Sequence, residues 1–89
     1  MKDIYAVYVL QSEKDKRYYT GYSNNVDRRM KEHNKGKTIS TRNRIPFRLV
    51  YKEGCSSKKD AKLKEKFFKS GKGREYINNK IRSGRGAGG

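Results

Sequence analysis

Two basic side chains lie one helical turn apart in the segment RYYTGYSNNVDRRMKEH, residues 17–33. Because Arg29 and His33 are four positions apart, they are neighbours on a helix, at the border between its apolar stripe and solvent. A guanidinium can clamp a phosphate, and an imidazole can accept or donate a proton near neutral pH. The spacing is equally compatible with two structural or solvated residues in a chain this basic.

Two tyrosines precede this helix, each on a segment with strand character. Tyr8 shares strand parity with Leu10, and Tyr19 shares parity with Gly21, whose missing side chain leaves space beside it. Both phenols are therefore candidates to face one pocket. The alternative is that they are amphipathic core residues, which is the common use of tyrosine in a small sheet.

One carboxylate occupies an unusual position in the second half of the chain. In the helix expected over 61–69, Ala61, Glu65 and Phe68 recur at i, i+4 and i+7, so Glu65 lies on an otherwise apolar stripe. A carboxylate there needs a partner, either a lysine of the same helix or a divalent cation. The lysines within reach are Lys62, Lys66 and Lys69.

Three strands and three helices must position these side chains. The strand over 4–10 has apolar residues at both parities, which is typical of a central strand covered on both faces. The order predicts an α+β fold, with a small, three-stranded, mainly antiparallel sheet flanked by helices. The expected strands are 4–10, 18–22 and 47–51, and the expected helices are 25–34, 61–69 and 74–81.

Capping residues and a polar loop separate these elements. Asn24 with Asp27 is predicted to cap the first helix, and Ser57 with Asp60 the second. The polar, basic segment 35–44 has no periodicity and is predicted to be a surface loop. The length predicts one domain over 1–82, followed by a flexible, glycine-rich tail over 83–89.

The charge balance points to a polyanionic partner. The chain has 24 Lys and Arg against 9 Asp and Glu, a formal net charge of +15 over 89 residues. This excess favours nucleic acid, and a membrane partner is not expected because no segment combines a long apolar face with a basic one. With one cysteine, Cys55, and one histidine, a disulfide or a zinc cluster is excluded. We expect a cytoplasmic protein, since no apolar run suits a membrane span or a signal peptide.

The order of these residues resembles the GIY-YIG endonuclease superfamily. The tripeptides 6–8 (AVY) and 19–21 (YTG) are followed by Arg29, His33 and Glu65. The resemblance covers about residues 3–80 and is close to the small single-domain bacterial members; similar modules occur in the excision-repair endonuclease and in a structure-specific resolvase. A role in DNA repair is one implication.

Two positions depart from the name-giving motifs of that family. Ala6 replaces the first glycine and Thr20 replaces the central isoleucine, while the tyrosines and Gly21 are retained. For the asparagine that the family carries near the end of the module, Asn78 and Asn79 are both candidates.

The resemblance implies a role for each candidate residue in hydrolysis of a phosphodiester. Tyr8 is the candidate general base and Tyr19 positions the water or the phosphate, with the reverse assignment of the two phenols left open. Arg29 clamps the phosphate, Glu65 holds one divalent cation, Mg²⁺ or Mn²⁺, and His33 hydrogen-bonds a phosphate or the water. Arg29 and the net positive charge are expected to lower the pKa of Tyr8, which is ordinarily near ~10.

Seven further cations are expected to follow the nucleic-acid backbone, four in the basic loop and three on the later helix. They are Lys35, Lys37, Arg42 and Arg44 in the loop, and Lys58, Lys59 and Lys62 on the helix. No helix-turn-helix or zinc finger is present to read bases, so selectivity for DNA structure is expected rather than for sequence. The alternative function is a non-catalytic binding module for DNA or RNA. A monomer, a weak homodimer and an accessory protein partner all remain open.

Overall fold

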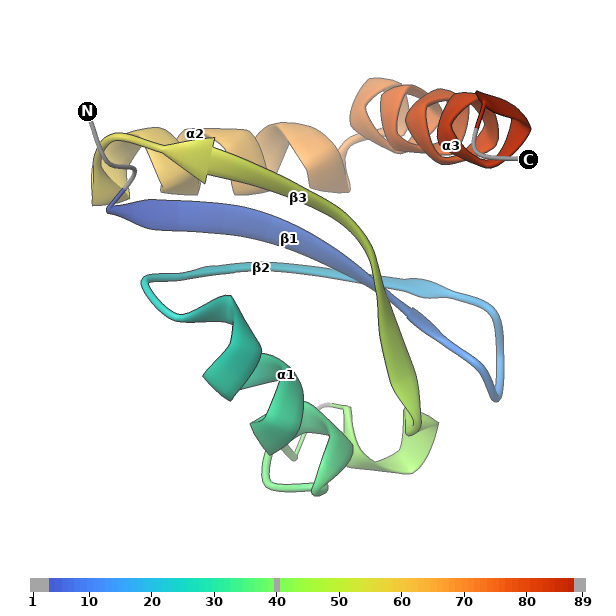
Figure 1. Cartoon of the computed structure of the whole chain (residues 1–89). Helices are drawn as coiled ribbons and strands as arrows, with labels where there is room; N and C mark the ends of the chain where they lie inside the picture. The colour runs from blue at the N-terminus through green and yellow to red at the C-terminus, as the bar shows by residue number, and fades with distance from the viewer. Residues whose placement is uncertain (1–3, 40, 88–89) are drawn as a thin grey trace.

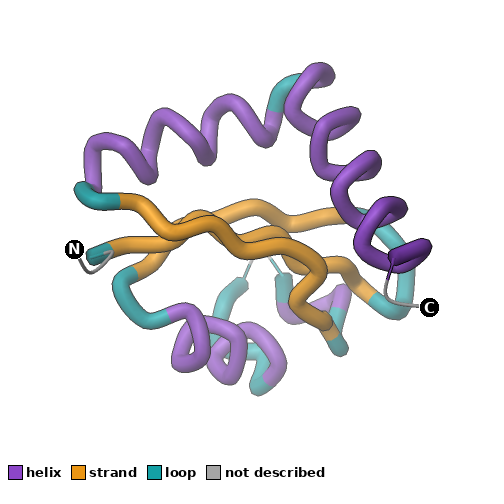
Figure 2. Tube along the Cα trace, turned by 45° about the horizontal axis from the view of Figure 1, so that its top comes forward, coloured by secondary structure: helices purple, strands orange, loops and turns teal. Residues whose placement is uncertain are grey.

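The computed structural model describes residues 4–39 and 41–87 and confirms the predicted α+β fold. Its three-stranded sheet has the order β2-β1-β3, and both strand pairings are antiparallel. Figures 1 and 2 show α2 and α3 on one side of this sheet, with α1 and the short 3₁₀ helix η1 on the other. The strands are β1 (Tyr5–Ser12), β2 (Tyr18–Ser23) and β3 (Phe47–Cys55), and the helices are α1 (Val26–Asn34), η1 (Arg42–Arg44), α2 (Lys58–Lys69) and α3 (Gly71–Ala87).

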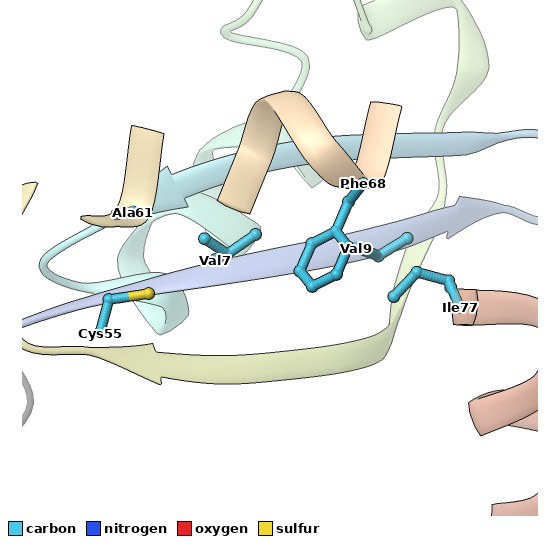
Figure 3. Packing of buried hydrophobic residues seen from close by; sticks show 6 residues of the cluster. All are labelled: Val7, Val9, Cys55, Ala61, Phe68 and Ile77. Carbon is cyan, nitrogen blue, oxygen red and sulfur yellow. The ribbon is translucent and has the colours of Figure 1, made fainter. Parts of the chain in front are cut away.

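The central position of β1 follows from its apolar residues at both parities. Val7 and Val9 are buried on the side of α2 and α3, whereas Tyr8 and Leu10 are buried in a second cluster on the side of α1. Figure 3 shows the side chains of Val9, Phe68 and Ile77 meeting in the first cluster. Each burial removes apolar surface from water on a different face, so β1 holds the two layers together.

The two capping predictions have different outcomes. The Ser57 side chain accepts a hydrogen bond from the Asp60 backbone N–H at 3.1 Å, as predicted, and α2 begins at Lys58 rather than at residue 61. The prediction for Asn24 is wrong. The next residue, Asn25, caps α1, because its side-chain oxygen accepts from the Arg28 N–H at 3.1 Å.

The C-terminal helix is longer than the sequence predicts. It begins at Gly71 and runs to Ala87, so it enters the segment 83–89 that was expected to be a flexible tail, of which residues 88 and 89 lie outside the described residues. A Cβ at Gly73 would lie 1.9 Å from the Phe67 carbonyl oxygen, so glycine is required where α3 turns away from α2. In the described part of the chain, no helix combines the length and the apolar character that crossing a membrane requires.

The segment between α1 and β3 is fixed at both of its ends. The Asn34 side chain accepts from the Phe47 N–H at 2.7 Å and donates to the Phe47 carbonyl at 3.1 Å. These two bonds join the last turn of α1 to the first residue of β3. The segment 35–44, predicted as a loop without regular structure, contains η1 near its end.

Candidate active site

The glycine of the second motif makes room for the tyrosine of the first. Tyr8 pairs with Gly21 across β1 and β2, and a Cβ at Gly21 would lie 2.7 Å from the Tyr8 hydroxyl oxygen. The same Cβ would lie 3.4 Å from the Tyr19 ring. Any side chain at this position would therefore displace the Tyr8 hydroxyl. The two phenols lie on one face of the sheet, as the strand parity predicts.

His33 lies at the centre of this aromatic group and is fully buried. Its Nε2 is 3.3 Å from the Tyr8 hydroxyl oxygen, and its ring centroid is 4.8 Å from that of Tyr19. The ring of Phe47, from the first residue of β3, also packs against the imidazole. α1 thus delivers His33 into the aromatic cluster beneath β1 and β2.

A threonine that sequence reasoning missed sets the tautomer of His33. The Thr41 Oγ1 is 2.9 Å from His33 Nδ1, and the Thr41 hydroxyl donates to the Thr38 carbonyl at 3.4 Å. With the Thr41 proton on that carbonyl, Oγ1 accepts from Nδ1–H and the lone pair of Nε2 faces Tyr8, which is the tautomer that we assign. Burial, and next the charge of Arg29, lower the pKa of His33 below its usual value, so the imidazole is neutral at pH 7.

Arg29 approaches the same hydroxyl from one turn earlier in α1. Its guanidinium is oriented by Glu32, whose Oε1 lies 2.8 Å from Arg29 Nη1. Burial raises the pKa of Tyr8, and the charges of Tyr19 and Glu65 also raise it, while a hydrogen bond with Arg29 and the charge of Arg29 lower it. Arg29 acts in the predicted direction, but burial outweighs it. The expectation of a lowered pKa for Tyr8 is therefore wrong for this state of the protein.

Glu65 reaches this site from the other layer of the molecule. It belongs to α2, which packs against β1 and β2 from the face opposite α1. Its charge nevertheless acts on Tyr8, whose pKa it contributes to raising. Of the partners that the sequence leaves open, the structure contains Lys69, whose Nζ is 3.2 Å from Glu65 Oε2. The Glu65 side chain is 24% exposed and can be reached by a ligand.

The donor set suits a cation that is shared with a substrate. Within the described residues there is no cluster of three or more His, Cys, Asp or Glu side chains that could hold a metal ion. Mg²⁺ is often bound by one or two carboxylates, with substrate phosphates and water completing its six oxygen ligands. Glu65 fits that pattern as a single carboxylate, whereas Glu32 is engaged by Arg29. A resident metal in an all-protein cage does not fit.

Comparison with known proteins agrees with this arrangement. The family model of the GIY-YIG catalytic domain matches residues 4–80. The chain belongs to the GIY-YIG family. It is 46% identical over 81 residues to a UPF0213 protein of Bacillus licheniformis, covering 86% of this chain and 82% of that protein. A UPF0213 protein of Streptococcus agalactiae is 44% identical over 64 residues, which are 71% of this chain and 72% of that one.

A solved relative supports the fold of this GIY-YIG domain. The solution NMR structure of a UPF0213 protein from Bacillus halodurans superposes with a TM-score of 0.52 at 40% identity. The match covers 84% of this chain and 82% of the other. Both asparagine candidates are exposed, and Asn78 accepts a hydrogen bond from the Tyr18 hydroxyl at 2.6 Å; the choice between them stays open.

The cations predicted to bind nucleic acid do not form one surface on this GIY-YIG domain. Six of the seven are exposed, but Lys35, Lys37 and Arg42 lie on the side of α1, whereas Lys58, Lys59 and Lys62 lie on α2. Arg44 has structural contacts instead. It pairs with Asp15 at 3.0 Å, donates to the Tyr18 carbonyl at 3.3 Å and stacks over the Phe47 ring. A role for these seven residues in binding stays a prediction.

Proposed function

We propose that this chain is a metal-dependent endonuclease that hydrolyses phosphodiester bonds of DNA and selects its substrate by structure rather than by sequence. The observation that carries the proposal is the environment of one hydroxyl. Within the GIY-YIG domain, the Tyr8 hydroxyl has the lone pair of His33 Nε2 at 3.3 Å, and the charges of Arg29 and Glu65 both act on it. A purely structural tyrosine needs none of these charged neighbours.

In this mechanism Tyr8 is the general base and His33 receives its proton. The tautomer held by Thr41 leaves Nε2 as the acceptor for the Tyr8 O–H. The ordinary pKa values of about 10 and 6.5 make this transfer unfavourable by about 5 kcal/mol, and the shifts seen here widen the gap. The proton therefore stays on Tyr8 in the free protein, and the transfer to His33 takes place only as Tyr8 removes the proton of the attacking water.

Arg29 acts on the phosphate. A phosphoryl group undergoing in-line attack gains negative charge on its oxygens, and a guanidinium fixed beside the nucleophile stabilises that charge. Glu32 holds Arg29 in place through the 2.8 Å contact, and the Arg29 side chain remains 34% exposed, so a phosphate can still reach it. Tyr19, against the His33 ring, orients the water or the phosphate.

Glu65 would hold the divalent cation, Mg²⁺ or Mn²⁺, together with phosphate oxygens of the substrate. When bound, such a cation stabilises charge on the phosphoryl oxygens and on the departing alkoxide. Lys69 forms an ion pair with the same carboxylate and has to be displaced. We therefore expect weak binding of the metal alone and stronger binding in the presence of DNA.

The test is a cleavage assay with branched, flapped and duplex DNA, and with RNA, in Mg²⁺ or Mn²⁺. The wild-type protein should cut at least one structure, and Glu65→Gln should abolish cutting. Glu75→Gln is the matched control, because it removes an exposed carboxylate from α3 and should leave the rate unchanged. Cleavage that persists undiminished in Glu65→Gln would refute the proposal.

The ion pair between Glu65 and Lys69 also favours a second candidate function. A carboxylate already neutralised by a lysine needs no metal, and a chain of net charge +15 can bind nucleic acid without cutting it. A non-catalytic binding module predicts no cleavage of any substrate and affinity that Glu65→Gln preserves or increases. The same assay, with binding measured in parallel, separates the two functions.

A further inference from the structure

Two adjoining clefts lie beside β2, outside the hydrogen-bonded group of Tyr8, His33 and Thr41. The first has a volume of about 260 Å³, and its lining includes Tyr18, Tyr19, Lys69 and Arg74. The second has a volume of about 420 Å³. It is lined by Asp15, Lys16, Arg17, Tyr18, Arg44 and Arg74. Tyr18 and Arg74 line both, so the two clefts adjoin, and we name them together the β2 groove.

The β2 groove is strongly positive. Its wider part carries four cationic side chains and a single carboxylate, that of Asp15. Arg44 already neutralises this carboxylate through their 3.0 Å contact. The salt bridges within the described residues involve none of the other three cations of the wider part, Lys16, Arg17 and Arg74, and all three are exposed. An anionic ligand would therefore meet three cations that no carboxylate engages.

The groove leads to the residues proposed for catalysis. Tyr19, in the lining of the narrower cleft, packs against the His33 ring with 4.8 Å between the ring centroids. Lys69, also in that lining, contacts Glu65 at 3.2 Å. A chain of phosphates lying in the groove would thus end beside Tyr19 and Glu65. These are the side chains proposed to position the scissile phosphate and to hold its cation.

The wall of the groove is held in place by two further contacts. The Tyr18 hydroxyl donates to Asn78 of α3 at 2.6 Å, and the Tyr18 carbonyl accepts from Arg44 at 3.3 Å. These bonds fix an aromatic ring between the two clefts. A fixed aromatic ring among cations is the combination that binds a strand of nucleic acid without reading its sequence.

We propose that the β2 groove binds the phosphate groups along the backbone of one nucleic-acid strand and leads it from Arg17 in the β1–β2 turn to Tyr19 and Lys69 at the catalytic residues. The direction toward the catalytic residues rests on the function proposed above; the binding itself does not. In this proposal the β2 groove, rather than the basic loop 35–44, is the main surface that binds the nucleic-acid backbone. Lys35 on the side of α1 and Lys58 at the start of α2 do not line either of these clefts.

Binding is tested in EDTA, where no metal is available for cleavage. The probe is a fluorescein-labelled flap DNA, and anisotropy is followed over a range of salt concentrations. Arg17→Gln and Arg74→Gln should each lower the slope of log K against log[salt] by about 0.7–0.9 and weaken binding several-fold, as expected when one phosphate contact is lost. The matched controls, Lys31→Gln and Lys52→Gln, remove the same charge from exposed positions outside both clefts and should change the slope by less than half as much.

Two further arms keep this proposal falsifiable. Arg74→Lys retains the charge and should retain most of the slope, which separates loss of a phosphate contact from a defect in folding. Amide chemical shifts of residues 15–19 and 69–74 should move most when DNA is added to the wild-type protein. Arg17→Gln and Arg74→Gln should lose the same affinity for an RNA flap of the same sequence as for the DNA flap, because the contacts go to phosphate.

The groove is refuted if Arg17→Gln and Arg74→Gln behave like the two lysine controls, or if the affected amides lie in segment 35–39 instead. A loss confined to DNA or to RNA would also overturn the backbone assignment, because it would place the contacts on the sugars or bases. Failure of the nuclease function looks different. In that case no substrate is cut in Mg²⁺ or Mn²⁺, while the groove variants still weaken binding.

Discussion

On the face of the sheet covered by α2 and α3, the core cluster is apolar and includes Val9 and Ile77. On the face covered by α1, the side chains buried just as completely include a phenol, an imidazole and a hydroxyl, from Tyr8, His33 and Thr41. The first face is held by non-directional packing, and the second by hydrogen bonds whose partners must all be present. This difference assigns stability mainly to one face, and the proposed general base with its hydrogen-bonded partners to the other.

The largest expected effect is on the α1 face. Tyr8→Phe keeps the ring and removes the hydroxyl, so the proposed cleavage should fall by about 10²–10⁴-fold, the usual contribution of a general base. Stability should change by about 1 kcal/mol, because one hydrogen bond is lost. The control is Tyr22→Phe, whose ring packs against the opposite cluster and whose cleavage rate should stay at the wild-type level. Equal rates for the two variants would contradict the proposed role of Tyr8.

The next effect belongs to the opposite face. Ile77→Ala leaves a cavity in the core beneath α2 and α3, and should cost about 2–5 kcal/mol of unfolding free energy. Thermal unfolding should show a large fall in Tm, while cleavage per folded molecule at saturating substrate stays the same at low temperature. Ile77 also lines the narrower cleft of the β2 groove, so substrate affinity is not part of this comparison. Ile39→Ala truncates an isoleucine that is 77% exposed and should leave the Tm unchanged. A loss of cleavage by folded Ile77→Ala would break the separation between the two faces.

A third change tests the space beneath the Tyr8 hydroxyl. In Gly21→Ala the new methyl group would lie 2.7 Å from that oxygen, so the phenol has to move. The expected result is a loss of cleavage of at least tenfold, with a destabilisation of about 1–3 kcal/mol from overpacking. In Gly71→Ala the added methyl group meets nothing within 4 Å, so this variant is the matched control and should cut normally.

A fourth change removes the acceptor for His33 Nδ1. Thr41→Val preserves shape but leaves a buried N–H without a partner, which should cost about 1–3 kcal/mol. The ¹⁵N chemical shifts of the imidazole should report a shift toward the Nε2–H tautomer, and cleavage should fall because Nε2 no longer accepts from Tyr8. Thr41→Ser restores the hydroxyl and should restore both the tautomer and the rate. An unchanged tautomer in Thr41→Val would refute this role.

The smallest expected effect is the pH dependence of stability. Burial holds the pKa of His33 below the value of about 6.5 that it has in the unfolded chain. As the pH falls below 6.5, His33 binds a proton in the unfolded state but not in the folded state. The free energy of unfolding therefore declines until the pH reaches the pKa of His33 in the folded state. Urea unfolding between pH 7.5 and pH 5 should show this decline, and His33→Gln should flatten it. A decline of the same size in His33→Gln would assign the effect to other groups.

Much of the fold and of the site could be predicted because local patterns encode them. The apolar residues at both parities of segment 4–10 identify a strand buried on both faces, and the parity places Tyr8 on one of them. Gly21 indicates a close approach between the strand backbone and the Tyr8 side chain. Arg29 and His33, four residues apart, lie one turn apart in α1, as the sequence predicts. These features depend on neighbours in sequence, so tertiary structure had little opportunity to override them.

Features that depend on distant contacts could not be predicted in the same way. Thr41 lies in a segment without periodicity, and only packing against α1 gives its hydroxyl a role. Arg44 looked like one more cation of the loop until the fold brought Asp15 and Phe47 beside it. The raised pKa of Tyr8 likewise follows from burial, which charge composition does not reveal.

The two bonds between the Asn34 side chain and the Phe47 backbone imitate a step of strand pairing. They hold the two ends of the intervening loop together. The position of α1 against β3 therefore does not depend on the residues at the tip of the loop. An insert between Lys37 and Thr38 would leave the contact between Thr38 and Thr41 in place, at a cost that grows by only about 0.6 kcal/mol for each doubling of loop length. Such an insert would add a new surface to the domain while the proposed catalytic residues stay where they are.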